Sequence, residues 1–437
     1  MILQVYAPQP TPRVRYCVAF WAEELLKVPV RIHTDPADYR SATGWHLNYS
    51  YRRELPHECW IVPQGLLFET GWRAQAIRVF QCRGRSAFFG EPGGEGDLPF
   101  DLLAMSFYLL SRYEEYLDFT PDAHGRFPAR ASLAHRHGFL SQALLDAWAL
   151  ELRRLLGTQP GRAALAPPPY QFLPTYDIDL AWAYRHKGGW RFWGGLWRDL
   201  FYGRWKAVGE RLKVGLGWSK DPFDTFDYMG QWQEKLRFDP VYFFLVGEAG
   251  PYDKNHAPDN PPFQQLIRQL HRSYRIGLHP SYRSYDQPAR VAQEQHRLES
   301  IIGEPIVRSR QHYLRLRFPH TYQTLLDVGI REDHTMGYAD ALGFRAGTSR
   351  AFWWYDLSTE QQTPLRVVPF AVMDVTLRQY LALEPTAALA LVADLIAELR
   401  TVGGTFAMLW HNNSLSEREG WEGWRRVYEG MVTLGRE

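Results

Sequence analysis

The sequence predicts an α/β protein in which a (β/α) barrel follows a smaller α/β domain. Short β-rich runs alternate with helical stretches seven or eight times after residue 170, which implies a parallel sheet, most simply closed as a barrel. A proline-rich seam precedes them, and polar residues end several of the runs. With 437 residues, 45% of them hydrophobic, the chain is long enough for two or three domains.

The seam is GTQPGRAALAPPPY, residues 157–170, and its prolines 167–169 cannot lie in a helix interior or a central strand. We therefore expect an N-terminal α/β domain of unknown function over residues 1–158 and the barrel over residues 170–437. The first domain holds the strand-like runs LQVYA, CWIVP and IRVFQC and two helical stretches, PFDLLAMSFYLLSRYEEYL and HGFLSQALLDAWALELRRLLG.

In the barrel the expected strands are FLPTYDID (172–179), VYFFLV (241–246), RIGLHP (275–280), PIVRSRQHY (305–313), GIRED (329–333), GFRAG (343–347), RVVPF (366–370) and TFAMLWH (405–411). A helix is expected over 385–404, because Pro385 suits a first turn and two glycines suit the end.

The composition excludes several classes of protein. A net charge of +2 does not imply a nucleic-acid partner. Three cysteines do not make a disulfide framework. The start, MILQVYAP, lacks the pattern of a signal peptide, and no run of apolar residues would span a membrane, so we expect a cytoplasmic protein; its oligomeric state stays open. An aromatic fraction of 15% suits a carbohydrate site, although most rings are expected in the core.

Polar residues close five of the expected strands, at the end of a parallel barrel where active sites form. Asp177 and Asp179 lie two apart, so both point to the same side of their strand. Two carboxylates that face one way repel each other unless a cation or a proton lies between them. The alternative is a pair of N-caps or a solvated strand end.

Histidines close three further strands, at His279, His312 and His411, and the segment Arg331–Tyr338 closes another. Each imidazole is well placed as a ligand or an acid–base group. A single histidine such as His279 is as often structural.

In this order, the five segments resemble the motifs of the NodB-homology polysaccharide deacetylases. Thr175-Tyr176-Asp177 matches the family's Thr-Phe/Tyr-Asp-Asp, which implies Asp177 as general base, with the metal-binding carboxylate displaced by one residue to Asp179. His279 fits the second motif, but Arg283 occupies the place of the partner histidine.

The remaining motifs are matched less evenly. Arg310 with His312-Tyr313 loosely resembles the third motif, and Leu409-Trp410-His411 matches the last, which implies His411 as general acid. The resemblance covers residues ~170 to 437 and implies a distorted (β/α)7-type barrel. A hydrolytic cation needs about three protein ligands, so we expect His312 to complete the set with Asp179 and His279. Zinc suits these nitrogen and oxygen ligands.

The resemblance implies a metal-dependent hydrolase that removes N-acetyl groups from a glycan, in bacterial cell-surface polysaccharide metabolism. We expect substrate contacts from Arg310, Arg315, Asp333, Tyr338 and Trp410, and Asp333 is also expected to orient His411. The alternative is a catalytically impaired carbohydrate-binding or scaffold protein on the same barrel. A glycosidase ranks low, because its carboxyls face each other across the scissile bond.

Two other segments stand out. Trp190, Arg191, Trp193, Trp197, Arg198, Trp205 and Lys206 lie between the first two barrel strands. They suit a glycan platform or a membrane surface, although an amphipathic helix with its tryptophans buried on the barrel is the simpler interpretation. The segment Tyr252–Asn255 either lines the mouth or is simply a turn.

Overall fold

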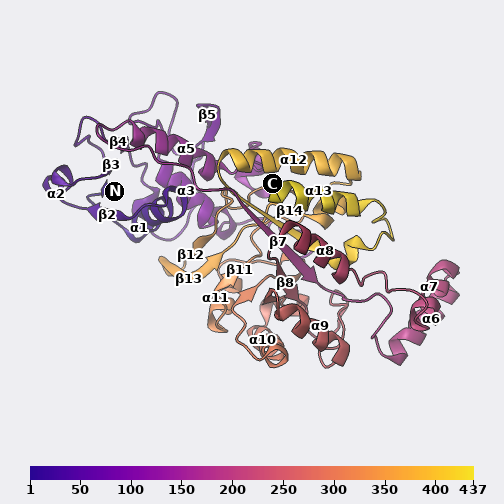
Figure 1. Cartoon of the computed structure of the whole chain (residues 1–437). Coiled ribbons are helices and arrows are strands. Elements are labelled where there is room, and N and C mark those ends of the chain that lie inside the picture. The colour runs from indigo at the N-terminus through magenta and orange to yellow at the C-terminus, as the bar shows by residue number, and fades with distance from the viewer.

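Figure 1 shows the computed structural model, which describes the backbone of residues 1–437 and every side chain except those of Trp190 and Arg191. The protein is a mixed α/β structure with a four-stranded sheet, a nine-stranded sheet and a two-stranded hairpin. In the described residues no helix is both long enough and apolar enough to cross a bilayer. All three cysteines are free.

The four-stranded sheet belongs to the N-terminal part and has the order β2-β1-β3-β4, with all neighbours parallel. Its strands are β1 (Leu3–Tyr6), β2 (Val30–His33), β3 (Trp45–Tyr49) and β4 (Cys59–Ile61). The principal helices around it are α1 (Pro12–Ala19), α3 (Leu102–Leu110) and α5 (Leu144–Gly157). The run IRVFQC contributes β5 (Phe80–Cys82), which forms an antiparallel hairpin with β6 (Arg85–Ala87).

Both predicted N-terminal helices are shorter than the sequence pattern indicates. The first ends before Arg112, whose φ of 54° lies in the left-handed region, and a 3-10 turn follows at Tyr113–Tyr116. The second begins at Leu144. The seam forms neither helix nor strand between residue 162 and β7, as the prolines predict.

The nine-stranded sheet has the order β12-β13-β11-β10-β9-β8-β7-β15-β14. Every neighbouring pair is parallel except β12 with β13. Its strands are β7 (Gln171–Ile178), β8 (Val241–Phe244), β9 (Arg275–Leu278), β10 (Arg308–Ser309), β11 (Glu332–Asp333), β12 (Phe352–Asp356), β13 (Gln361–Val367), β14 (Val372–Met373) and β15 (Thr405–His411). The sheet is curled. Because no ladder in the described backbone joins β12 to β14, it forms an open half-barrel.

The predicted strand at 343–347 is wrong. These residues form a turn in which Gly343 and Gly347 have φ of 121° and 67°, a region that glycine enters without steric cost. The turn packs on the N-terminal part, since Phe344 N–H donates to the Leu140 carbonyl over 2.8 Å. Two further strands were not predicted from the sequence: β12, which forms an antiparallel hairpin with β13, and the two-residue β14, which pairs with β15.

Helices cover the outside of the curled sheet (Figure 1). They are α8 (Phe226–Leu236), α9 (Pro261–His271), α10 (Pro288–Ile302), α11 (His320–Asp327), α12 (Pro385–Thr401) and α13 (Trp424–Arg436). The helix predicted from Pro385 is α12, and the chain leaves it through Gly403 with φ of 61°. By contrast, α6 (Gly189–Phe201) and α7 (Trp205–Gly215) stand away from the body (Figure 1).

The N-terminal part packs closely against the curled sheet. One hydrophobic cluster runs through both, and buried ion pairs join them. Arg345 donates two hydrogen bonds to Glu115, and the buried Arg13 donates to Glu360 over 2.9 and 2.5 Å. The two parts therefore share one core.

Candidate metal centre

The carboxyl ends of neighbouring parallel strands bring five predicted side chains to one edge of the sheet. β15 pairs with β7 so that His411 lies opposite Asp177, and Asp177 in turn lies opposite Phe243 of β8. Asp179 follows β7 directly, His279 follows β9, and His312 follows β10. The strand order alone therefore places residues from four separate segments together.

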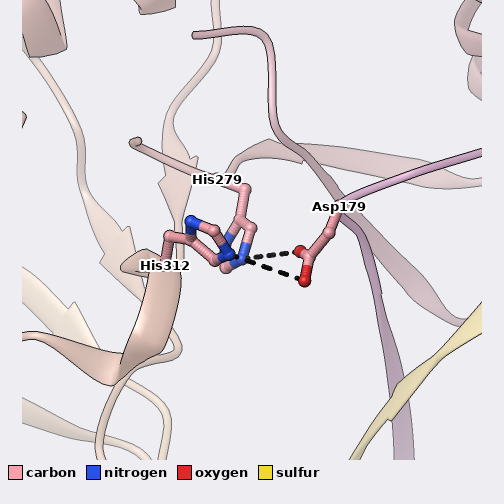
Figure 2. A group of neighbouring side chains, drawn as sticks. All are labelled: Asp179, His279 and His312. Carbon is pink, nitrogen blue, oxygen red and sulfur yellow. Dashed lines mark ion pairs between the residues drawn. The ribbon is translucent and has the colours of Figure 1, made fainter. Parts of the chain in front are cut away.

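Asp179, His279 and His312 meet most closely, with one ligand atom from each within 4.8 Å of the others. Nε2 of His279 lies 3.2 Å from Asp179 Oδ1, and Nε2 of His312 lies 3.5 Å from Oδ2. Figure 2 shows both imidazole edges directed at the carboxylate. Asp179 is 32% exposed, whereas both imidazoles are buried, so the group is reached from the carboxylate side.

The far nitrogen of each imidazole is held by the protein. His279 Nδ1 donates to the Arg310 carbonyl over 2.5 Å, since a carbonyl only accepts. His312 Nδ1 lies 2.9 Å from Asp253 Oδ1, which also accepts from the Tyr282 N–H over 2.7 Å. With the proton on Nδ1, a neutral imidazole presents the Nε2 lone pair toward Asp179, as in metal-ligating histidines.

These residues fit a divalent cation. Asp179 Oδ1 is buried and has no hydrogen-bond partner among the described residues, which is costly unless another group satisfies it. Partial burial opposes the charge, but the imidazoles of His312 and His279 hold the pKa of the Asp179 carboxyl well below its ordinary value. Two imidazole nitrogens and one carboxylate oxygen are a donor set that zinc accepts.

Asp177 lies beside this cluster and is fixed by Arg310. The guanidinium donates to Asp177 Oδ1 over 2.9 Å, which leaves Oδ2 facing His279 Nε2 at 3.8 Å. Arg310 is fully buried and stacks on the Phe243 ring at 4.6 Å. A Cβ on Gly277 would meet that ring at 2.5 Å, so glycine in β9 makes room for the residue that supports Arg310.

His411 faces the cluster from β15, with Nε2 3.8 Å from Asp179 Oδ2. Its partner is Asp374, which accepts from His411 Nδ1 and from the His411 backbone N–H, both over 2.8 Å. Burial disfavours the charged imidazole, but Asp374 and Asp179 together raise the pKa of His411 to about 10. His411 is therefore protonated at neutral pH.

The expectation that Asp333 orients His411 is wrong. Asp333 is fully buried and accepts from Ser309 Oγ and Thr335 Oγ1 over 2.9 and 2.8 Å. Asp374 takes the orienting place because β14 pairs with β15 and brings the residue after Met373 alongside His411.

Two predicted substrate contacts lie in the core. Tyr338 is 3% exposed, and its hydroxyl accepts from Arg112. Trp410 is 0% exposed and packs on the Tyr428 ring at 5.5 Å. Side chains alternate along a strand, so His411 faces the site while Trp410 faces helix α13. Neither Tyr338 nor Trp410 offers surface to a substrate in this structure.

The two arginines near the second and third motifs differ in position. Arg283, at the place of the family's second histidine, is exposed and lies beside Gly250. Arg315 lies over the Tyr282 and Tyr285 rings at 4.1 and 3.9 Å and donates to the carbonyls of His124 and Tyr282. His312, from a different strand end, stands where a third ligand is needed.

A group of aromatic rings borders the centre. Tyr313 follows His312, with the two rings 4.8 Å apart, and Tyr252 stacks on Tyr282 at 4.2 Å. His124, from the N-terminal part, packs against all three tyrosines. The sequence offered the segment of Tyr252 as a lining of the mouth, whereas the contributions of Tyr282 and His124 were not predicted.

Sequence reasoning also missed the roles of Asp253 and Asp374. Asp253 lies in the turn that the sequence placed at the mouth, and a carboxylate after an apolar strand was the available signal. Asp374 follows VPFAVM, another apolar run that ends in a carboxylate.

Comparison with known proteins gives a family for the N-terminal part alone. Residues 3–160 match the model of a family of unknown function (DUF7033). No curated protein matches the chain.

Three solved structures are similar to this chain at low identity. A Mycobacterium smegmatis protein assigned to the polysaccharide deacetylases has 14% identity and a TM-score of 0.36, over 62% of this chain and 85% of its own. A polysaccharide deacetylase from Bacillus cereus has 10% identity and a TM-score of 0.27, over 60% and 85%. A Pseudomonas aeruginosa protein assigned to the same class has 10% identity and a TM-score of 0.35, over 61% and 83%.

Proposed function

We propose that this protein is a metal-dependent hydrolase that removes N-acetyl groups from an amino-sugar glycan. The observation that carries the proposal is the meeting of Asp177, Asp179, His279, His312 and His411 at one edge of the curled sheet. The set combines a candidate metal site with one carboxylate and one imidazolium beside it. Metal-assisted amide hydrolysis uses these groups: a Lewis acid, a base and an acid.

Asp179, His279 and His312 are the residues that would hold the cation. When bound, a divalent cation of this kind polarises an acyl oxygen and makes water more acidic. Zinc is the metal we propose, on the grounds of its ligand preference.

Asp177 is proposed as the general base. The Arg310 guanidinium holds Oδ1, so Oδ2 is the oxygen that remains to take a proton from the attacking water. Because both Arg310 and Asp177 are buried, the carboxylate keeps one orientation. A fixed base within reach of the reacting water accelerates its attack.

His411 is proposed as the general acid, which protonates the departing amine. Its Nδ1 is committed to Asp374, so Nε2 is the nitrogen that donates toward the site. Burial disfavours the charged imidazole, but the Asp374 carboxylate beside Nδ1 raises the pKa of His411, which favours the proton on the imidazole. Base and acid thus stand on neighbouring strands, in register with each other.

A sugar ring is the proposed occupant of the neighbouring aromatic border. Tyr252 is 44% exposed and lies against Tyr282 and Tyr313, so part of its surface is open to a ligand next to the residue that follows His312. Apolar faces of sugar rings pack on such rings, and tyrosine hydroxyls add hydrogen bonds.

The test is acetate release from N-acetylated chitooligosaccharides by the zinc-loaded protein, with the variants Asp177→Asn and His411→Ala. Each variant is expected to lose about a hundredfold or more in rate, while His296→Ala, at an exposed site in α10, is expected to keep full activity. Rates unchanged in both site variants would refute the assigned roles. Glycan binding without acetate release would instead support the carbohydrate-binding alternative.

A further inference from the structure

Helices α6 and α7 form a hairpin with a small core of its own. The pair follows the carboxyl end of β7 and stands off from the rest of the molecule (Figure 1). Leu196, Val208 and Val214 are buried between the helices. Arg211 also lies inside and pairs with the buried Asp199 over 2.8 Å. The inner faces of both helices are therefore already occupied.

The hairpin is anchored at its base. The Asp221 carboxylate accepts hydrogen bonds from the backbone N–H groups of residues 183, 184 and 185, over 2.7 to 2.9 Å. This ties the chain that enters the hairpin to the chain that leaves it. Glu210 of α7 pairs with Arg418, in the loop beyond β15. The hairpin thus projects from the segment after β7, the strand that Asp179 follows.

Large aromatic rings cover its outer face. Trp193, Trp197 and Phe201 are spaced four residues apart, so they line one side of α6, and they are 56%, 71% and 85% exposed. Trp205 at the start of α7 is 71% exposed, and Trp218 after its end is 76% exposed. The interpretation that these tryptophans are buried on the barrel is wrong; Trp190 and Arg191 lie outside the described side chains.

Cations surround these rings, and the acidic groups nearby are engaged. Arg198, Arg204, Lys206 and Lys213 are exposed. Between residues 192 and 218 the carboxylates are Asp199, which is buried against Arg211, and Glu210, which is paired with Arg418. The described surface of the hairpin is therefore aromatic and positively charged.

We propose that this hairpin docks the protein on an anionic lipid bilayer, with the rings in the interfacial layer and the cations at the headgroups. Tryptophan prefers this layer, and basic residues beside it are attracted to anionic lipids. The partner we infer is a lipid surface, because the exposed cations around the rings are complementary in charge to lipid phosphates. The anchored base would hold the metal-bearing edge at a fixed distance from the membrane.

The test is co-sedimentation of the full chain with vesicles of phosphatidylcholine, with and without phosphatidylglycerol. The wild type is expected to bind the phosphatidylglycerol vesicles, less strongly at high salt. The variant Trp197→Ser/Phe201→Ser/Trp205→Ser is expected to bind about a hundredfold more weakly, roughly fivefold for each ring withdrawn from lipid. The variant Arg204→Glu/Lys206→Glu/Lys213→Glu is expected to lose the gain from phosphatidylglycerol.

Matched controls separate docking from misfolding and from self-association. Tyr51→Ser/Trp72→Ser removes exposed rings elsewhere and is expected to bind vesicles as the wild type does. Circular dichroism and cobalt binding are expected to be unchanged in every variant, because the substituted side chains are exposed. Full vesicle binding by the triple serine variant would overturn the proposal. So would a wild type that ignores vesicles and forms a dimer in ultracentrifugation that the serine substitutions dissolve.

Discussion

Replacing Asp253 by asparagine tests whether the candidate metal centre depends on a charge behind its ligand. Asp253 Oδ1 accepts both the His312 Nδ1 proton and the Tyr282 N–H, while Oδ2 has no hydrogen-bond partner among the described residues. An asparagine whose amide oxygen takes the place of Oδ1 keeps both bonds. The substitution therefore removes the charge and leaves the geometry.

Two effects of this change oppose each other. Loss of a charged partner behind a ligating histidine costs about 10- to 100-fold in metal affinity, or about 1.4 to 2.7 kcal/mol. The second effect concerns the proton on His312. Burial disfavours the charged imidazole, but Asp179 and Asp253 raise the pKa of His312 to about 9. At neutral pH a metal must therefore first displace a proton. Asparagine at 253 lowers that pKa and eases the competition.

The balance between these effects changes with pH. Below about pH 9, wild-type affinity rises with pH by up to about tenfold per unit, because His312 must give up its proton. The affinity of Asp253→Asn levels off at lower pH. We therefore expect a small difference near pH 7 that widens to the full 10- to 100-fold near pH 9.

The assay is titration of the metal-free protein with Co²⁺, followed by calorimetry and by the visible absorbance of bound cobalt, from about pH 6.5 to about pH 9. Asp286→Asn, at an exposed carboxylate near the same rim, is the matched control and is expected to follow the wild type throughout. Equal affinities of Asp253→Asn and the wild type at the highest pH would refute the reasoning. A difference that shrinks with pH would refute it as well.

Three further predictions follow from other contacts. Asp374→Asn is expected to lower the pKa of His411 from about 10 toward its ordinary value, measured by NMR titration, and to slow acetate release about a hundredfold. An unchanged His411 titration would contradict the pairing of His411 with Asp374. Glu115→Gln leaves the buried Arg345 guanidinium without its carboxylate. The free energy of unfolding, measured with urea, is expected to fall by about 3–5 kcal/mol. A loss below about 1 kcal/mol would show that the Glu115–Arg345 pair is solvated. Burial raises the pKa of Asp101 from 3.8 to about 6, so protonation of this carboxyl stabilises the folded state at low pH. The contribution is about 3 kcal/mol and is lost as the pH rises from about 4 to about 6. In urea unfolding, the stability of Asp101→Asn is expected not to show this loss.

Local sequence patterns predicted most of the barrel strands and the helix after Pro385, because alternation and capping act within a few residues. They failed at 343–347, where an apolar, glycine-flanked segment looks like a strand. Gly343 there sits against the backbone of residue 140, and no local pattern encodes that contact. Helix α3 was predicted too long for a similar reason, since Arg112 turns out of the helix to reach Glu115 and the Arg345 carbonyl.

The sequence by itself determined which residue types end the strands, and that was enough to bring Asp179, His279 and His312 to attention as one candidate set. Carboxylates and imidazoles that follow apolar runs can be recognised directly in the sequence. Because parallel strands end at the same edge of the sheet, such residues are expected to lie together. Only the tertiary structure decided which groups stand behind them. Asp253 behind His312 and Asp374 behind His411 depend on contacts between distant segments. It also decided that Trp197 faces solvent whereas Trp410 is buried, because burial depends on which neighbour packs against a residue, and two tryptophans look alike in a sequence.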